Sequence, residues 1–331
     1  MIIITGGAGF IGSAVIWRLN QLGRDDILVV DHLGTNEKWK NLTPLRFTDY
    51  VEKDDFLEAV ANRKRSALVT SLLKRIEAIL HLGACSSTTE LDASFLMMNN
   101  FAYTKQLALF AADRSVRFVY ASSAATYGNG SQGFSDDESL LGSLRPLNVY
   151  GYSKHLFDLW AWRSGLLAGI AGLKYFNVFG PNEYHKGDMS SLVLKAYGQI
   201  RESSKLKLFR SHRAGYADGE QVRDFIYVKD AVDMTLHILD NAAANGIFNI
   251  GSGTATTWNC LAQSIFGALD VPCRIEYIDM PPGIRRNYQY HTCAATAKFQ
   301  LSGYSGTAMS LHDAVCDYVT NYLKTGQRLG E

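Results

Sequence analysis

The sequence has almost no excess of one charge, since 33 lysine and arginine residues stand against 32 aspartate and glutamate residues. A chain without a basic field has no general attraction for nucleic acid or for an acidic membrane surface, so we expect neither as a partner. No apolar run reaches the ~18 residues of a membrane-spanning helix, and the N-terminus lacks the basic and apolar regions of a signal peptide. These absences predict a cytoplasmic protein whose anionic ligands are held by local groups.

Cysteine is also scarce. The five cysteines are an odd number and no two form a Cys-x-x-Cys pair, so we expect neither a disulfide framework nor a metal site. A chain of 331 residues is long enough to bury a sizeable core without such cross-links. We predict that Cys85 is a buried small residue rather than a nucleophile, because it has no evident histidine partner. The charged stretch at 62–76 is predicted to be a solvated surface helix.

Short apolar runs alternate with helical patterns through the first half of the chain. The runs at 2–4, 27–30, 78–82 and 118–121 are continuous rather than alternating, which is typical of strands covered on both faces. Their alternation with helices predicts an α/β fold with a doubly wound parallel sheet, the Rossmann architecture. We predict a dinucleotide-binding domain at 1–176 and a smaller, interleaved C-terminal substrate domain at 177–219 and 253–331. Strands near 220–252, such as those at 224–228 and 247–251, are expected to return to the first domain.

Glycines follow the first predicted strand at a regular spacing. Residues 5–12 read Thr-Gly-Gly-Ala-Gly-Phe-Ile-Gly, which places Gly6, Gly9 and Gly12 three residues apart. Gly6 allows a tight turn, Gly9 lets the backbone approach a pyrophosphate, and Gly12 lets the following helix pack against the sheet. The N-terminus of that helix offers free N–H groups and a positive dipole end to phosphates. The strand–glycine–helix context therefore predicts a nicotinamide dinucleotide site.

The residues after the second strand leave the choice of dinucleotide open. Asp31 ends that strand, where an acid usually bonds the ribose hydroxyls and repels a 2′-phosphate, which favours NAD. His32, Lys38 and Lys53 lie nearby in the sequence and could bind the 2′-phosphate of NADP.

A tyrosine and a lysine four residues apart form the predicted catalytic pair. Tyr150 and Lys154 share one face of a helix, where the ammonium is expected to lower the phenol pKa from its ordinary value of ~10. A phenol of this kind is a usable acid and base for an alcohol–ketone pair. Ser123 follows the fourth apolar run, so it should lie at the carboxyl edge of the sheet and hydrogen-bond the reacting oxygen.

These features resemble the extended short-chain dehydrogenase/reductase family, which includes sugar-nucleotide epimerases. The match covers essentially the whole chain, and its most specific pieces are similar to the ADP-glycero-manno-heptose 6-epimerase family. Those pieces are Gly83–Glu90 (Gly-Ala-Cys-Ser-Ser-Thr-Thr-Glu) and His185–Gly187 (His-Lys-Gly), while Tyr120–Gly128, Asn148–Lys154, Tyr175–Pro181 and Arg223–Phe225 extend the match.

The resemblance implies an enzyme that inverts C6″ of ADP-D-glycero-D-manno-heptose and acts in lipopolysaccharide core synthesis. Hydride leaves C6″ for the nicotinamide, a 6″-keto intermediate turns in the pocket, and the hydride returns to the opposite face. The resemblance also implies a homo-oligomer, either a pentamer or a decamer. It implies NADP as the cofactor, which outweighs the argument from Asp31, although NAD stays open.

The resemblance assigns roles to individual residues. Tyr150 is one acid/base and Lys186 the other, while Lys154 tunes Tyr150 and holds the nicotinamide ribose. Together with the glycine loop, the expected cofactor contacts are Gly6, Gly9, Phe10, Ile11, Gly12, Asp31, His32, Lys38, Lys53, Leu82, Gly83, Ala84, Cys85, Ser86, Asn99, Lys154, Val178 and Lys186. The expected contacts with the ADP-heptose substrate are Asn177, Asp188, Lys195, Phe209, Arg210, Ser211, His212, Arg223 and Tyr288. Asp188 stands where a serine is common in this family and Lys195 where a histidine is common.

Three other functions are weighed against this one. Sugar-nucleotide 4,6-dehydratases carry Asp-Glu beside the serine or threonine, where this chain has Ala124 and Ala125. A UDP-hexose 4-epimerase shares every general motif, and only the heptose-specific pieces argue against it. A noncatalytic NAD(P)-sensing protein of the same fold commonly loses the tyrosine or the lysine, and this chain keeps both. Fold alone does not separate these functions, because function resides in the site.

Overall fold

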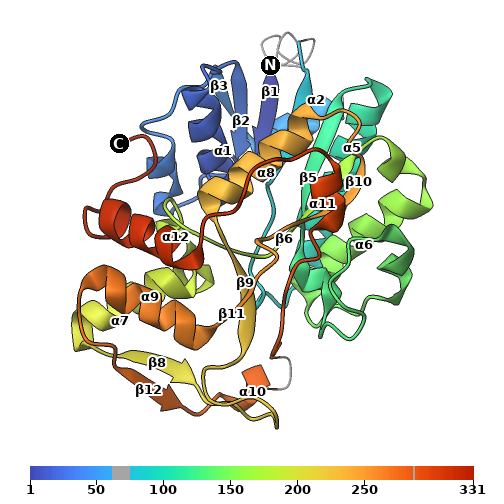
Figure 1. Cartoon of the computed structure of the whole chain (residues 1–331). Coiled ribbons are helices and arrows are strands. Elements are labelled where there is room, and N and C mark those ends of the chain that lie inside the picture. The colour runs from blue at the N-terminus through green and yellow to red at the C-terminus, as the bar shows by residue number, and fades with distance from the viewer. Residues whose placement is uncertain (62–74, 286–287) are drawn as a thin grey trace.

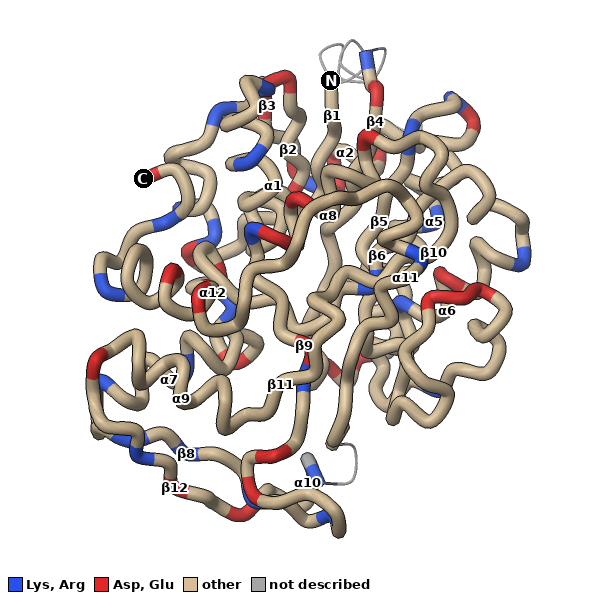
Figure 2. Tube along the Cα trace, in the orientation of Figure 1, with Lys and Arg blue, Asp and Glu red and all other residues tan. Residues whose placement is uncertain are grey.

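The computed structural model describes residues 1–61, 75–285 and 288–331 (Figure 1). The surface helix predicted at 62–76 therefore falls almost wholly outside the described residues. Figure 1 shows a large sheet flanked by helices and a smaller lobe below it that contains α7, β8, α9 and β12. Lysine, arginine and acidic positions are intermixed along the trace of both lobes (Figure 2), as the near balance of charge predicts.

Seven parallel strands form the large sheet, which confirms the predicted α/β fold with a Rossmann-type sheet. Their order is β10-β6-β5-β4-β1-β2-β3, and all neighbours are parallel. The strands are β1 (Ile2–Thr5), β2 (Ile27–Asp31), β3 (Asp49–Glu52), β4 (Ala78–His81), β5 (Arg117–Ser123), β6 (Ala171–Tyr175) and β10 (Gly246–Ile250). Because β2 and β4 lie on opposite sides of β1, the winding of the sheet reverses beside β1, which is where such sheets bind ligands.

Apolar side chains cover both faces of this sheet, which is why its strands are continuous apolar runs. Ile2 and Ile4 of β1 point into one core, while Ile3 between them points into the other. The first core is closed by α1 (Phe10–Gln21) and α8 (Val228–Asp240), which pack against each other. The second core is closed by α2 (Lys53–Val60), α5 (Tyr103–Asp113) and α6 (Val149–Arg163).

The second half of the chain builds two small sheets. One holds β7 (Asn177–Phe179), β9 (Val222–Tyr227) and β11 (Ala255–Thr257), and the other pairs β8 (Leu206–Phe209) with β12 (Ile275–Ile278). Strand β10 returns to the large sheet as predicted, but the strand expected at 224–228 does not, since β9 pairs with β7 and β11. Besides α8, the longer described helices of this half are α7 (Leu192–Ser203) and α9 (Trp258–Leu269).

Short helices complete the described chain. They are η1 (Glu37–Asn41), α4 (Ala93–Leu96), η2 (Met97–Ala102), η3 (Ala124–Tyr127), η4 (Glu138–Ser143), η5 (Leu166–Ala168), η6 (Tyr184–Met189), α10 (Pro282–Arg285), α11 (Ala297–Leu301), α12 (Leu311–Asp317) and η7 (Tyr318–Leu323). Within the described ranges, no helix has the length and apolar character that a bilayer crossing requires. The same residues contain no group of three metal-ligating side chains.

Candidate active site

The glycine loop after β1 is built so that only glycine fits. Gly6 has a φ of +70°, and a Cβ atom there would lie 2.6 Å from the backbone nitrogen of Gly83, in the segment after β4. A Cβ atom at Gly12 would overlap the carbonyl oxygen of Gly6. The Gly9 N–H donates to that same carbonyl at 3.0 Å, which closes the turn. The loops after two neighbouring strands therefore meet at the reversal point of the sheet.

Helix α1 begins directly after this loop and presents its N-terminus to a cavity. Its N-cap residue is Gly9, which has no side chain to occupy the first amides of the helix. Free N–H groups and the positive end of the helix dipole at this position suit the pyrophosphate of a dinucleotide. The residues present therefore fit the nicotinamide cofactor that the sequence predicts.

Two cavities adjoin the glycine loop and share several lining residues. The larger, of about 670 Å³, contains all four predicted catalytic side chains, and the smaller, of about 430 Å³, extends past the end of β2. Every predicted cofactor residue lines one or both cavities. The larger is lined by Gly6, Gly9, Phe10, Ile11, Gly12, Asp31, Lys38, Leu82, Gly83, Ala84, Ser86, Lys154, Val178 and Lys186, and the smaller adds His32, Lys53, Cys85 and Asn99. Cys85 is partly exposed in the smaller cavity, so the prediction that it is a buried core residue was wrong.

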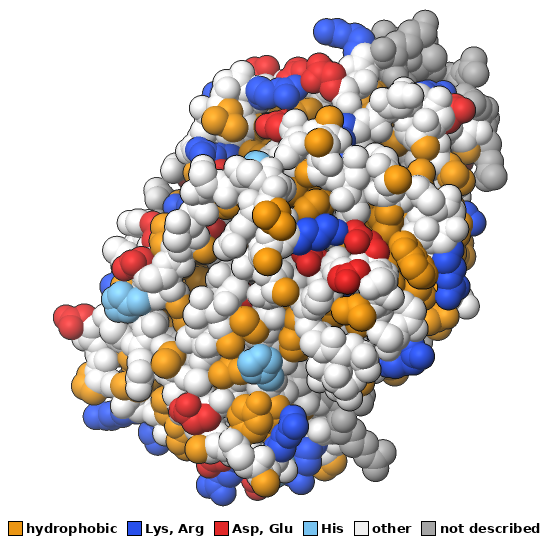
Figure 3. All heavy atoms as spheres, turned by 45° about the vertical axis from the view of Figure 1, so that its right-hand side comes forward, with side chains coloured by type: hydrophobic (Ala, Val, Ile, Leu, Met, Phe, Trp, Pro, Cys, Tyr) orange, Lys and Arg blue, Asp and Glu red, His pale blue; other side chains and the backbone are white. Residues whose placement is uncertain are grey.

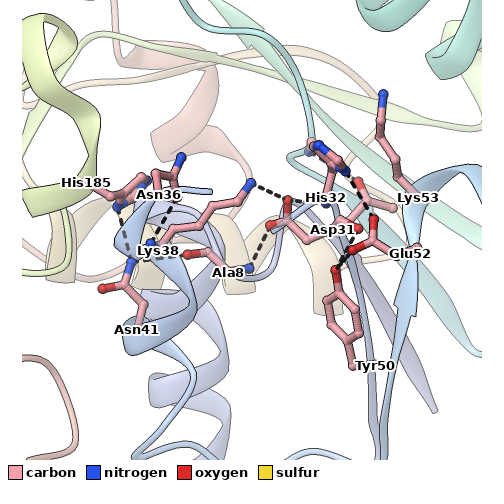
Figure 4. A network of polar contacts seen from close by, with 12 residues as sticks. Ala8, Asp31, His32, Asn36, Lys38, Asn41, Tyr50, Glu52, Lys53 and His185 are labelled. Carbon is pink, nitrogen blue, oxygen red and sulfur yellow. Dashed lines mark hydrogen bonds and ion pairs between the residues drawn. The ribbon is translucent and has the colours of Figure 1, made fainter. Parts of the chain in front are cut away.

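The carboxylate of Asp31 accepts hydrogen bonds at both of its oxygens (Figure 4). Its Oδ2 atom accepts the Ala8 N–H of the glycine loop at 2.8 Å, and its Oδ1 atom accepts the His32 N–H at 2.7 Å. Lys38 reaches across from η1 and donates to the same Oδ1 atom at 2.7 Å. Asp31 thus holds the glycine loop, and its negative charge is paired with a lysine that borders both cavities.

Lys53 lies at the opposite side of the smaller cavity. Its Nζ atom donates to Asn99 Oδ1 at 2.9 Å. Asn99 and Asn100 belong to η2, a π-helical turn, a distortion that is frequent at functional sites. The Asn100 side chain exchanges two hydrogen bonds with the backbone of Cys85 and donates to Ser153 in α6. This turn therefore ties the segment after β4 to the helix that carries the predicted catalytic pair.

Tyr150 and Lys154 lie in the first two turns of α6, which begins after the N-cap Asn148. The Asn148 side chain accepts the Gly151 N–H at 2.7 Å. The Lys154 Nζ atom donates to the carbonyl of Ala121 at 2.9 Å, so the lysine is anchored to β5. Ser123 ends that strand and lines the same cavity as Tyr150. The structure therefore brings the three predicted residues together.

The protonation of this pair differs from the sequence prediction. Burial raises the pKa of Tyr150, and a hydrogen bond with Ser123 opposes that rise. Burial also lowers the pKa of Lys154 to about 8, while the negative charge of Asp158 acts in the opposite direction. The expected lowering of the Tyr150 pKa is therefore wrong, because desolvation of the phenol outweighs the effect of its neighbours.

A buried ion pair lies behind the catalytic helix and was missed from the sequence. Asp158 of α6 and Lys174 of β6 are 3.8 Å apart at their closest charged atoms, and both side chains are almost completely buried. Asp158 also accepts the hydroxyls of Tyr120 at 2.9 Å and Ser122 at 2.6 Å. This network joins α6 to β5 and β6 one turn below Lys154.

Lys186 belongs to η6 and lines the larger cavity. Its Nζ atom lies 5.2 Å from the centroid of the Phe10 ring in the glycine loop. Burial lowers the pKa of Lys186, while Glu183 raises it and Lys195 lowers it further. Asn177, Asp188 and Lys195, three of the predicted substrate residues, line the same cavity.

The other predicted substrate residues lie outside both cavities. Phe209 ends β8, and the following residues 210–212 lead away from it, with the His212 N–H donating to the Tyr290 hydroxyl at 3.0 Å. Arg223 of β9 is buried between two rings, 5.5 Å from the centroid of Trp258 and 5.1 Å from that of Tyr288. The six residues are Phe209, Arg210, Ser211, His212, Arg223 and Tyr288, and Tyr288 directly follows the undescribed residues 286–287.

Trp258 links these residues to the larger cavity and was not singled out in the sequence. It lines the cavity, and its indole N–H donates to the Tyr288 hydroxyl at 2.9 Å. It is the first residue of α9, which Thr257 caps by accepting the Cys260 N–H. A helix-start tryptophan has no spacing or charge signal that separates a cavity residue from a core residue.

The sequence matches the model of the NAD dependent epimerase/dehydratase family over residues 2–251. It is also similar to a protein of Nitratidesulfovibrio vulgaris that is named ADP-L-glycero-D-manno-heptose-6-epimerase. The two are 53% identical over 323 residues, which cover 98% of this chain and 98% of that protein.

Two solved structures show the same architecture. The ADP-L-glycero-D-manno-heptose-6-epimerase of Helicobacter pylori superposes with a TM-score of 0.75 at 25% identity, covering 97% of this chain and 95% of that chain. A UDP-glucose 4-epimerase of Thermus thermophilus in complex with NAD superposes with a TM-score of 0.74 at 22% identity, covering 96% and 97%. The second likeness speaks for the fold alone.

Proposed function

This chain belongs to the NAD dependent epimerase/dehydratase family, and on that premise we propose that it inverts C6″ of ADP-D-glycero-D-manno-heptose to give ADP-L-glycero-D-manno-heptose. The substrate assignment rests on the 53% identity to a heptose epimerase over nearly the full length of both chains. It confirms the family resemblance that the sequence indicated. The site supports the reaction, because Ser123, Tyr150, Lys154 and Lys186 line one cavity beside the glycine loop.

The arrangement of the side chains suits an inversion without net oxidation. Bound nicotinamide supplies a hydride acceptor that becomes the hydride donor once the ketone has turned. Tyr150 and Lys186 come from different elements, α6 and η6, so one residue removes the hydroxyl proton on one face of the sugar. The other returns a proton to the ketone oxygen after the sugar has rotated. Ser123 orients the reacting oxygen. Lys154 would bind the nicotinamide ribose, and its positive charge tunes the acidity of Tyr150.

We further propose that the resident cofactor is NADP. Both oxygens of Asp31 accept hydrogen bonds, from Ala8, His32 and Lys38, and Lys38 also forms an ion pair with it. The charge that would repel a 2′-phosphate is therefore paired. Lys38 and Lys53 border the smaller cavity from two sides, and both are well placed for such a phosphate. The family model and the NAD-containing structural neighbour support the nicotinamide dinucleotide as a class.

Self-association is also proposed, with the pentamer or decamer of the family resemblance as the expected form. Exposed apolar side chains are present on adjoining elements, with Phe95 of α4, Met98 of η2 and Tyr152 of α6 exposed by 43%, 72% and 48%. On the face shown in Figure 3, hydrophobic side chains lie among charged ones toward the right-hand edge. Light scattering on Met98→Glu would test whether this surface takes part, with a smaller particle as the expected result.

The domain division at residue 176, the cytoplasmic location and the role in lipopolysaccharide core synthesis remain proposals of the same kind. All five cysteines are free thiols, which suits a reducing compartment.

The decisive experiment is incubation of purified protein, without added cofactor, with ADP-D-glycero-D-manno-heptose, followed by chromatographic separation of the two C6″ epimers. We expect a mixture of epimers, and the nucleotide released by denaturing the protein should be NADP. If no conversion occurs even with added NADP or NAD, the heptose assignment fails. Conversion of UDP-glucose to UDP-galactose would then favour the rival 4-epimerase.

A further inference from the structure

The segment that carries Lys186 is closed into a ring by one buried carboxylate. Gly180 follows β7 and Ser191 caps α7, so these residues mark the two ends of the segment. The Glu183 Oε1 atom accepts the Gly180 N–H at 3.2 Å and the Ser191 hydroxyl at 2.7 Å. Its Oε2 atom accepts the Ser191 N–H at 2.6 Å. Glu183 is 0% exposed, so these bonds are not in competition with water.

Asn182, the residue before Glu183, links this segment to helix α1 and to the C-terminal end of the chain. Asn182 has a φ of +77° and is also 0% exposed. Its side chain donates to the Ser13 hydroxyl of α1 at 3.0 Å and accepts the Leu329 N–H at 3.0 Å. Its carbonyl accepts a hydrogen bond from Asn41 at 3.0 Å. The segment is therefore held against α1, whose N-terminus is the expected phosphate site.

The hydrogen bonds of Glu183 and Asn182 set the position of Lys186. The Lys186 N–H donates to the carbonyl of Glu183 at 3.0 Å, which begins the short helix η6. Only two residues separate Lys186 from Glu183, so a shift of Glu183 moves Lys186 relative to the Phe10 ring and the glycine loop. Of the residues that hold the segment, Ser191 also lines the larger cavity.

We propose that Glu183 is a positioning residue that holds Lys186 over the cofactor loop and supplies the buried negative charge that balances its ammonium. The inference rests on the proposed role of Lys186 as an acid/base. Three donors point at the Glu183 carboxylate, which favours its ionised form, although burial raises its pKa. Removing its charge leaves the effects of burial and Lys195 on Lys186 unopposed.

The other charged and titratable side chains that line the cavity are Asp31, Lys38, Tyr150, Lys154, Tyr175, His185, Asp188 and Lys195. Tyr318 of η7 also interacts with Glu183. The proposed mechanism requires that one of Tyr150 and Lys186 is protonated while the other is not. Because burial raises the pKa of Tyr150 and lowers that of Lys186, the first proton lost on raising the pH comes from Lys186. The acid limb of the kcat profile therefore follows Lys186.

Glu183→Gln keeps the size of the side chain and removes its charge. We expect kcat to fall by about tenfold or more and the acid limb to move to lower pH by about one unit, with little change in KM. In a Lys186→Met background the same change should cause no further loss of kcat, since Glu183 acts through Lys186. Glu202→Gln, an exposed glutamate on α7, is the matched control and should resemble wild type.

Ser191→Ala tests the effect of Glu183 on the position of Lys186 separately from the effect of its negative charge. It removes one donor to Glu183 and leaves the carboxylate, so we expect a lower kcat with an acid limb at its wild-type pH. If Glu183→Gln does not fold, Ser191→Ala decides, and a wild-type kcat in that variant overturns the inference. A folded Glu183→Gln protein with an unmoved acid limb, or one that loses further activity in the Lys186→Met background, also overturns it.

The experiment also separates failure of the inference from failure of the proposed function. If the wild-type protein interconverts no heptose epimers, both the proposed function and this inference fail. If the wild type is active and Glu183→Gln behaves like it, the inference alone fails.

Discussion

The Lys195 Nζ atom donates a 2.7 Å hydrogen bond to the backbone carbonyl of Asp188. These are the two positions at which we expect the sequence to depart from the family pattern, and both line the larger cavity. The two departures are therefore one local feature of the wall that faces Lys186. The Lys195 ammonium adds a positive charge at the exposed side of the cavity, and its hydrogen bond to Asp188 holds it near the end of η6.

We predict that Lys195→Met raises the KM for the ADP-sugar about tenfold, because an ammonium able to meet the diphosphate is lost. It should also move the acid limb of kcat to higher pH, since Lys195 lowers the pKa of Lys186. Steady-state kinetics across a pH series measure both effects. Lys205→Met, an exposed lysine beyond α7, is the control. An unchanged KM would show that Lys195 does not meet the substrate.

Tyr150→Phe should lower kcat by about 10²- to 10⁴-fold, because the variant keeps the ring and loses the proton donor and acceptor. The thermal midpoint should stay close to that of wild type. Tyr152→Phe offers a matched control two residues along the same helix, where the ring is 48% exposed. The measurement is epimer interconversion at saturating substrate. Equal rates for Tyr150→Phe and wild type would remove the phenol from the mechanism.

Much of the fold follows from the sequence because its strands are buried on both faces. The runs at 2–4 and 27–30 could form only central strands, and Gly6 and Gly12 are required by close backbone contacts. The pairing of β9 was not predictable, because a buried apolar run does not specify which sheet it joins. The ion pair of Lys174 in β6 with Asp158 in the preceding helix α6 was not predictable either, because the spacing of the two residues carries no signal that their side chains meet.

The candidate site divides in the same way. The Tyr150–Lys154 spacing is local and visible in the sequence, whereas the charge state of Tyr150 depends on burial that only the packed structure determines. The contact between Asp31 and Lys38 also depends on the path of η1.

Lys53→Met should weaken NADP binding about tenfold and change NAD binding less than about twofold, because we propose that Lys53 meets the 2′-phosphate, which NAD lacks. Fluorescence titration of protein stripped of cofactor gives both dissociation constants. Lys40→Met on η1 is a suitable control, since Lys40 pairs with Glu37 and lines neither cavity. Equal weakening for both dinucleotides would mean that Lys53 supports the shape of the cavity and does not select the cofactor.

The stability of the chain should fall as the pH drops below about 6.5, and His81 is one cause. Thr5 and Thr104 occupy its two ring nitrogens at 2.6 and 2.8 Å, and burial lowers its pKa to about 3. Burial likewise lowers the pKa of His155 and of His185 to about 4. Between pH 6.5 and the lowered pKa values, these histidines are protonated in the unfolded chain and neutral in the folded chain. The free energy of unfolding therefore falls with decreasing pH, by up to ~1.4 kcal/mol per pH unit for each histidine.

Urea unfolding at several pH values measures this slope. His81→Gln should reduce it by up to ~1.4 kcal/mol per pH unit, even where the variant is less stable overall, because the slope counts protons and not contacts. His312→Gln, on the exposed side of α12, should leave the slope unchanged. Carboxylates whose pKa is raised by burial, such as Asp158 and Asp224, act with the opposite sign and are common to all three proteins. A His81→Gln slope equal to that of wild type would mean that His81 takes up its proton without unfolding the chain, so the ring would have to reach water through a local opening near Thr5.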